Sequence, residues 1–212
     1  MTEVSFFPPQ RHAGAPQETD RDEPWMVPAW DGPDWHTRPG LCPLSVVLGR
    51  SATTAVLVEG VRAHPTGVVL RLVVQLRERG REARRRVVTE LDVTHGRGQL
   101  ALSLPAGGLR WGVEYSDGRR VTSVDDYSPH EASPDEWDPD WLPDRPVLRG
   151  LGRPTSWGGA WSRDVWLWPL PPPGPLRLVC AWPDRGIAET GTTVDAGPIR
   201  QAAAQAVPLW DE

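Results

Sequence analysis

The stretch Val68-Val-Leu-Arg-Leu-Val-Val-Gln-Leu76 decides the fold class of this chain. Its apolar residues at positions 68, 70, 72, 74 and 76 recur with a period of two, while Arg71 and Gln75 fall on the opposite face. A period of two is typical of a β-strand that buries one face. The segment therefore predicts a half-buried strand.

Similar runs lie on both sides of this segment. Turn sequences separate several of them, such as His64-Pro-Thr-Gly67 and the hairpin pair Asp117-Gly118. We expect further strands over residues 44–48, 54–63, 87–93, 100–104, 109–115, 119–124, 165–168, 176–182 and 188–194. Many short strands with few helical stretches predict an all-β fold, an antiparallel β-sandwich that is Ig-like in general layout.

One helix is expected, near the C-terminus. Asp195 is a suitable N-cap, Pro198 suits the first turn, and the Ala-rich segment 199–207 ends before Pro208. The stiff segment Leu170-Pro-Pro-Pro-Gly-Pro175 cannot take part in a strand ladder, and we expect it to connect a hairpin of strands 165–168 and 176–182.

Charge and apolar content divide the 212 residues into an arm and one domain. Residues 1–43 are rich in Pro and acidic residues and predict an extended or disordered arm. Residues 44–212 predict a single β-sandwich domain. Within it, residues 125–144 hold eight carboxylates and no Arg, which indicates an acidic insertion.

The composition limits the compartment and the chemistry of the chain. All 23 basic residues are Arg, and 12 Trp stand against two Phe and two Tyr, so Trp is the main aromatic residue for core and surface alike. The acidic start lacks the features of a signal peptide, and no apolar run approaches the roughly 18 residues of a membrane helix. Cys42 and Cys180 do not make a disulfide framework. We expect two free, buried thiols in a cytoplasmic protein that does not enter a membrane.

The C-terminal part carries a resemblance. It contains Trp166-Leu-Trp-Pro-Leu-Pro-Pro-Pro-Gly-Pro-Leu176, then Ala181-Trp-Pro-Asp-Arg-Gly-Ile-Ala-Glu-Thr190, and it closes on Leu209-Trp210. These blocks, with the turns Ala63–Gly67 and Glu114–Gly118, resemble a family of uncharacterised proteins from high-GC actinobacteria, over roughly residues 41–210. The resemblance implies one fold and a cytoplasmic location, and it carries no activity, substrate or site residue.

The sequence singles out no catalytic, cofactor-binding or metal-binding set. It holds no complete nucleotide-binding fingerprint and no nucleophile elbow, and its five His are scattered singly. The oxygen donors Asp135, Glu136, Asp138 and Asp140 lack the EF-hand pattern, and we interpret them as a solvated loop. We therefore expect a non-catalytic protein without cofactor or metal. The alternative is a hydrolase or small-ligand enzyme built on the sandwich, using acidic residues or His64.

Arginines are concentrated in residues 77–86, Arg-Glu-Arg-Gly-Arg-Glu-Ala-Arg-Arg-Arg. We interpret this block as the solvated tip of a hairpin between strands 68–76 and 87–93. Its candidate contact residues are Arg79, Arg81, Arg84, Arg85 and Arg86. Single-stranded nucleic-acid binding through this tip is an alternative, which the net charge of −5 opposes. A third possibility is that the acidic insertion covers the tip.

Tryptophans give the strongest functional signal. Trp157, Trp161, Trp166 and Trp168 fall within 12 positions and are candidates for a docking surface, unless both faces of their strand are covered. Trp25, Trp30, Trp35, Trp137 and Trp141 lie in Pro- and Asp-rich segments. They favour anchoring of the arm on its own domain, with a partner protein or a sugar ring as alternatives.

These observations favour a cytoplasmic interaction module that presents Trp- and Arg-rich surface to another protein. The enzyme and the nucleic-acid binder are the alternatives.

Overall fold

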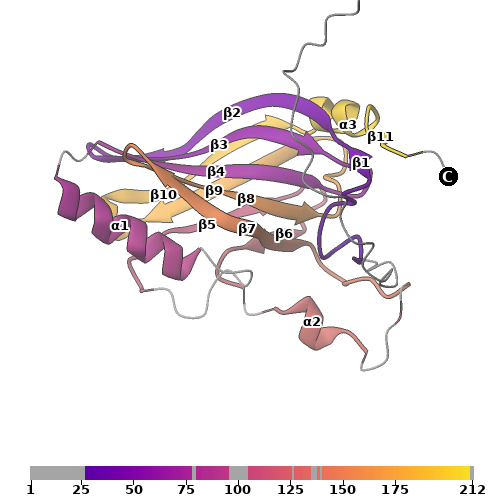
Figure 1. Cartoon of the computed structure of the whole chain (residues 1–212), viewed down its shortest axis with the longest axis horizontal. Helices are drawn as coiled ribbons and strands as arrows, with labels where there is room; N and C mark the ends of the chain where they lie inside the picture. Colours follow the sequence, from indigo (N-terminus) through magenta and orange to yellow (C-terminus); the bar gives the residue numbers. More distant parts are fainter. Residues whose placement is uncertain are drawn as a thin grey trace, which may run out of the picture.

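The alternating segment Val68–Leu76 forms strand β4 at the centre of a five-stranded antiparallel sheet (Figure 1). The strands lie in the order β2-β3-β4-β8-β7, so β4 pairs with β3 (Thr54–Ala63) and β8 (Ala160–Trp168). The edge strands are β2 (Gly40–Arg50) and β7 (Val147–Trp157). The computed structural model describes residues 27–77, 80–95, 105–125, 127–134, 138 and 140–210. β3 and β4 occupy the ranges expected for them, and for β4 the period of two predicts this range.

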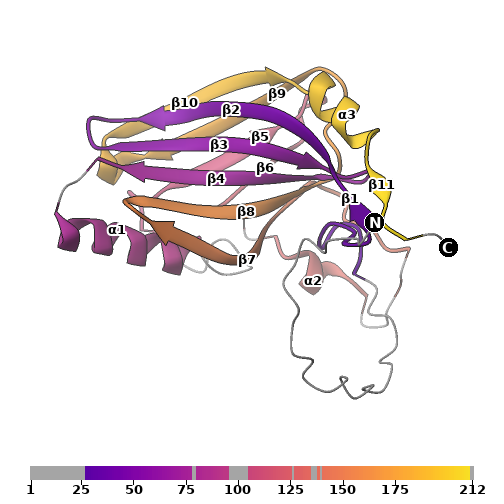
Figure 2. The same ribbon diagram turned by 45° about the horizontal axis from the view of Figure 1, so that its top comes forward.

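A second antiparallel sheet packs face to face with the first. Its four strands lie in the order β10-β9-β5-β6 and comprise β10 (Ile187–Asp195), β9 (Pro175–Trp182), β5 (Arg110–Glu114) and β6 (Arg120–Thr122). The edge strands β2 and β10 lie side by side along one side of the sandwich, where the Thr192 hydroxyl donates to the Val47 carbonyl at 3.1 Å (Figure 2). The predicted all-β sandwich is confirmed, and its Ig-like layout stays a prediction.

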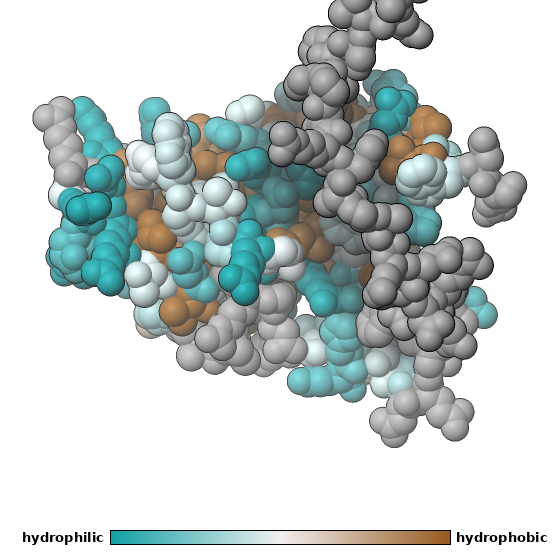
Figure 3. Space-filling model, in the orientation of Figure 1, coloured by the Kyte–Doolittle hydropathy of each residue, from teal (hydrophilic) through white to brown (hydrophobic). Residues whose placement is uncertain are grey.

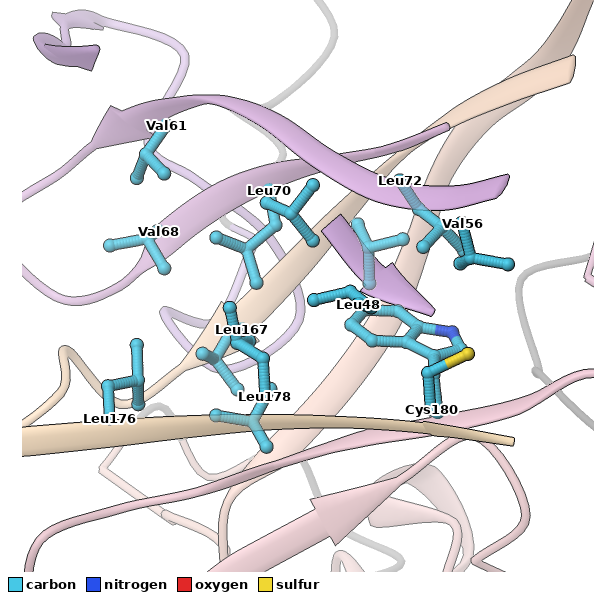
Figure 4. Packing of buried hydrophobic residues seen from close by; sticks show 14 of the residues in the cluster. Leu48, Val56, Val61, Val68, Leu70, Leu72, Leu167, Leu176, Leu178 and Cys180 are labelled. Atoms are coloured by element: carbon cyan, nitrogen blue, oxygen red, sulfur yellow. The ribbon is translucent and has the colours of Figure 1, made fainter. Parts of the chain in front are cut away.

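The core lies between the two sheets and is built from the residues that alternate inward. Figure 4 shows Leu70 and Leu72 of β4 facing Leu178 and Cys180 of β9 across this layer. Full burial of an aliphatic side chain is worth about 1.5–3 kcal/mol, so these facing rows are the main source of stability. Cys42 and Cys180 are both buried and free, as predicted.

The strand expected over residues 87–93 is wrong, because these residues belong to helix α1 (Arg81–Thr94). The alternation of Val87, Thr89, Leu91 and Val93 is typical of a strand. The buried residues are instead Val87, Leu91 and Thr94, whose spacing is that of a helix. Ala, Arg, Glu and Leu also favour helix over strand. The Arg-rich block is therefore a short connection and the start of a helix, and no hairpin tip joins these segments.

The remaining helices are short. α2 (Pro129–Ala132) lies within the acidic insertion, and the 3₁₀ turn η1 (Pro183–Arg185) follows β9. The predicted C-terminal helix is present as α3 (Gly197–Ala203), but its N-cap is Ala196 and not Asp195, and it ends at Ala203, before the predicted end at residue 207. After it, β11 (Val207–Pro208) pairs with β1 (Thr37–Arg38) in a two-stranded ribbon.

Three other segments differ from the expectation. β2 begins at Gly40, so residues 40–43 belong to the sheet and not to the arm. The sequence does not predict β7, because Gly150, Gly152 and Pro154 interrupt the apolar alternation that is typical of a strand. The Pro-rich segment 170–175 joins β8 of one sheet to β9 of the other, so strands 165–168 and 176–182 are not a hairpin. The strand expected over 100–104 lies outside the described residues.

Candidate interaction surface

Three of the four candidate tryptophans are buried, which corrects their interpretation as a docking surface. Trp161 and Trp166 are fully buried and Trp168 is 8% exposed, because β8 is covered on both faces. Trp161 faces the main core, while Trp166 and Trp168 lie on the outer face of the five-stranded sheet. Only Trp157 is a surface residue among the four, and its exposed fraction is 85%.

The outer face of β8 is covered by the segment that precedes β1. Trp30 of this segment is buried against Trp166 and Trp168, and the Trp166 indole donates to the Ala29 carbonyl at 3.1 Å. Trp141 packs edge-on against Trp30, with ring centroids 5.5 Å apart. Anchoring of the chain on its own domain is thus confirmed for Trp30 and Trp141.

Trp35, of the same group, does not share that position. Trp35 is 64% exposed. Trp25 and Trp137 lie outside the described residues.

The candidate arginines lie in the first two turns of α1. Arg81, Arg85 and Arg86 are exposed and Arg84 is half-buried, whereas Arg79 lies outside the described residues. A helix turns by about 100° per residue, so Arg81, Arg84 and Arg85 share one side and Arg86 lies across the helix from Arg84. The sequence does not show which of these arginines share a side, because it does not reveal that they lie on a helix.

The start of α1 lies against the turn between β7 and β8. A Cβ at Gly159 would lie 3.5 Å from Cδ and 3.6 Å from Nη1 of Arg84, and the Leu76 amide donates to the Gly159 carbonyl at 2.8 Å. Gly158 and Gly159 both have positive φ, and this tight turn leaves the neighbouring Trp157 indole outside. We call Trp157, Arg81, Arg84 and Arg85 the Arg–Trp surface.

The electrostatic setting of this surface is positive. Within the described ranges no ion pair joins Arg81, Arg84 or Arg85 to a carboxylate. The N-terminus of a helix carries about half a positive charge, which adds to the arginines. Figure 3 shows hydrophilic residues gathered where Figure 1 places the start of α1. The surface is therefore suited to a negatively charged ligand.

The described part of the acidic insertion lies at the other end of the sandwich and does not cover the arginines (Figures 1 and 2). His130 of α2 pairs with Asp31 at 2.7 Å, and Asp31 also pairs with Arg149 of β7. The His130 and Trp30 rings meet edge-on at 4.9 Å. The insertion thus packs on the segment that precedes β1.

A second polar cluster lies under β7, and sequence reasoning missed it. Arg163 is only 3% exposed, and its guanidinium donates to the His95 carbonyl at 2.5 Å and to the Gly152 carbonyl at 3.2 Å. It lies flat on Gly150, where any side chain would clash. Burial, reinforced by Arg163, lowers the pKa of His95 to about 4. These groups join α1 to β7 and β8.

His64, the named candidate of the enzyme alternative, and the Cys180 thiol both occupy structural positions. His64 is buried against Trp166, and burial is the main cause of its lowered pKa. Burial raises the pKa of Cys180 to about 12, which leaves its thiol protonated and unreactive.

The metal-ligand candidates are divided between described and undescribed residues. Asp138 and Asp140 are exposed, whereas Asp135 and Glu136 lie outside the described residues. In the part of the chain that the structure describes, no group of three or more His, Cys, Asp or Glu could hold a metal ion.

None of the helices in the described ranges has both the length and the apolar composition needed to span a membrane.

Comparisons with known proteins found no relative of this chain. No family model matches the chain, and neither a curated protein nor a solved structure matches it significantly.

Proposed function

We propose that this protein is a non-catalytic interaction module whose Arg–Trp surface binds a carboxylate-rich segment of a partner protein. The observation that carries the proposal is an 85% exposed Trp157 on the β7–β8 hairpin, whose Gly159 turn lies against Arg84, together with three arginines of α1 that have no carboxylate partner in the described residues. Trp and Arg are the residue types enriched at the energetic centres of protein interfaces.

The chemistry of the surface fits a carboxylate ligand. A guanidinium binds a carboxylate with two parallel hydrogen bonds, and a neighbouring indole offers an apolar face with little conformational entropy to lose. Arg84 is already held against the β7–β8 turn, which reduces the cost of ordering it on binding. Single-stranded nucleic acid is favoured less, because Trp157 alone supplies a stacking platform here and the net charge is −5.

The cytoplasmic location is part of the proposal. Two free, buried thiols fit a reducing compartment, where disulfides are rare. Membership of the actinobacterial family that the C-terminal blocks resemble stays a prediction.

The test is quantitative capture of partners from a lysate by matched variants of the full chain. We expect at least one protein whose capture falls about tenfold both with Trp157→Ala and with Arg81→Glu/Arg84→Glu/Arg85→Glu, a loss of ~1.4 kcal/mol. The control Trp35→Ala/Arg38→Glu changes an exposed Trp and an exposed Arg elsewhere and should leave this capture unchanged. Nuclease treatment should also leave it unchanged.

Two results would overturn the proposal. One is a set of captured proteins that is the same for the surface variants and the wild type. The other is capture that disappears with nuclease, which would assign the arginines to nucleic acid.

A further inference from the structure

The outer face of the five-stranded sheet carries a row of side chains that ends at Trp157. The strand register aligns this row across all five strands, and directly opposite residues share a face (Figure 2). From one edge of the sheet to the other, the row consists of Arg50 of β2, Ala55 of β3, Gln75 of β4, Ala160 of β8 and Trp157 of β7. Because Ala160 alternates with the core residue Trp161, the row lies on the outer face. We call it the Arg50–Trp157 row.

Long side chains stand at both ends of this row, and small ones lie between them. Trp157 is 85% exposed and Arg50 is also exposed, whereas Ala55 and Ala160 are half-buried. Between the two alanines, the exposed Gln75 offers a side-chain amide, which has donors and an acceptor for a peptide backbone. An extended chain that crosses the strands therefore finds a low floor here, with a hydrogen-bonding group at its middle.

An apolar row borders this floor on the side away from the β7–β8 turn. The register aligns Val47 with Leu57 and Leu57 with Val73. Val47 is 47% exposed, Leu57 is half-buried and Val73 is buried. Contact with the first two would bury aliphatic side chains of a ligand, which is favourable in proportion to the apolar area removed from water.

The row is positively charged at both of its ends. Within the described ranges, neither Arg50 nor the arginines of the Arg–Trp surface pair with a carboxylate. The carboxylates of Glu59 and Asp164 lie beyond the apolar row, and Asp164 already pairs with Arg62 at 2.7 Å. Two separate positive ends are complementary to a ligand with two separate carboxylate groups.

The distance between the two ends sets the length of such a ligand. Arg50 and Trp157 lie on the two edge strands of the five-stranded sheet. Neighbouring strands are about 4.8 Å apart, so the backbones at the two ends are separated by about 19 Å. An extended chain rises about 3.3 Å per residue, and about six residues cover that distance.

We propose that the partner segment lies extended along the Arg50–Trp157 row, with one carboxylate group at the Arg–Trp surface and a second about six residues away at Arg50. This binding mode rests on the proposed function, and it adds the spacing of the acidic residues. Arg50 binds the second carboxylate with two parallel hydrogen bonds, and Gln75 bonds the backbone between the acidic ends. Aliphatic side chains of the segment contact Val47 and Leu57.

The test is fluorescence anisotropy of two labelled octapeptides with the full chain at low salt. The split peptide is Glu-Glu-Ser-Val-Ser-Val-Glu-Glu, and the clustered peptide is Ser-Val-Glu-Glu-Glu-Glu-Ser-Val. The two have the same composition and net charge, so they differ only in the spacing of their carboxylates. We expect the wild type to bind the split peptide about fivefold more tightly, the effect of one further exposed ion pair.

Variants of the full chain assign this difference to the row. Arg50→Glu should lower the affinity ratio of the two peptides to about one, and Arg50→Gln should lower it in the same direction. Arg38→Glu changes an exposed arginine elsewhere and should keep the ratio of the wild type. Trp157→Ala should weaken the binding of both peptides, since both use the Arg–Trp surface.

Three results would overturn this binding mode: a ratio near one in the wild type, a ratio that Arg50→Glu leaves unchanged, or no binding of either peptide. The first two leave the proposed function standing if Trp157→Ala still weakens both peptides. Capture from the lysate tests the proposed function separately.

Discussion

At the scale of single residues, tryptophan takes two different parts in this molecule. Trp166 fills the space between its own sheet and the segment that precedes β1, and its indole N–H has a carbonyl partner. Trp157 has the same side chain at a hairpin turn and lies in solvent. The sequence places both in one cluster. Which face each ring occupies depends on a covering segment far away in the chain, and no local pattern shows it.

Substituting these two residues tests that assignment. Trp166→Ala should lower the free energy of unfolding by about 3–5 kcal/mol, because it leaves a large cavity on the outer face of β8. Trp157→Ala should change it by less than about 0.5 kcal/mol. Urea denaturation of both variants measures the difference. Equal losses would contradict the burial of Trp166 or the exposure of Trp157.

A second prediction at this scale concerns His95 and acid. Its pKa is about 4 in the fold and about 6.5 in an unfolded chain, because burial and Arg163 oppose its protonation. The unfolded state therefore takes up the proton first as the pH falls. The contribution of His95 is fully present above about pH 6.5 and is lost progressively toward pH 4, by roughly 2 kcal/mol at pH 5.

The measurement is the free energy of unfolding at pH 7 and at pH 5. His95→Gln should lose most of this pH dependence, whatever its effect on stability at pH 7. The exposed His36→Gln serves as the control and should keep the dependence of the wild type. A dependence in His95→Gln equal to that of the wild type would contradict the burial of this imidazole.

At the scale of elements, the central strands could be predicted and α1 could not. β3 is a long apolar run, and β4 alternates at Val68, Leu70, Leu72 and Val74, so both segments predict strands. β4 is nevertheless buried on both faces, because Val69 packs with Trp166 on the outer face of the sheet. In residues 87–93 the same alternation arises by coincidence. Thr89 and Val93, which a strand would bury on the same face as Val87 and Leu91, are exposed. The helix instead buries Val87, Leu91 and Thr94, which follow the helical period.

β7 could not be predicted for a different reason. Its glycines and Pro154 interrupt any apolar pattern, and its ladder is irregular between Leu151 and Thr155. The strand is defined by its partner β8, against which it runs for most of its length. Pairing of this kind is a tertiary property, and a single segment does not encode it.

The contact between α3 and β2 gives a prediction at this scale. A Cβ at Gly40 would lie 1.8 Å from the Ala202 carbonyl oxygen, and backbone on both sides leaves little room to move. Gly40→Ala should therefore destabilise the fold by about 1–3 kcal/mol or more through overpacking. Gly32→Ala is the matched control, because its nearest neighbour is an ordinary 3.6 Å away.

Hydrogen exchange locates that effect. In Gly40→Ala the amides of α3 should exchange faster than those of β4, because the helix is the element displaced. A Gly40→Ala variant as stable as Gly32→Ala, with α3 protected as in the wild type, would contradict this packing.

At the scale of the whole molecule, the fold is a β-sandwich in which part of the outer face of the five-stranded sheet is also covered. The outer face of the five-stranded sheet is covered at one end by Trp30 and Trp141, and the Arg–Trp surface lies at the other end, beside the β7–β8 turn. The sequence predicts the two-layer core, the arginine-rich block and the anchoring role of some tryptophans. It does not show which tryptophans meet or which end each occupies, because these contacts join segments far apart in the chain.

The functional account depends most on the division of the tryptophans into core and surface. Hydroxyl-radical footprinting of the intact protein, read by mass spectrometry for each indole, measures that division directly. We predict that Trp157 is oxidised fastest among the tryptophans that the structure describes. Four others, Trp111, Trp161, Trp166 and Trp182, are at most 2% exposed and should stay protected until the protein unfolds. A protected Trp157, or a Trp166 oxidised as fast as Trp157, would contradict the account.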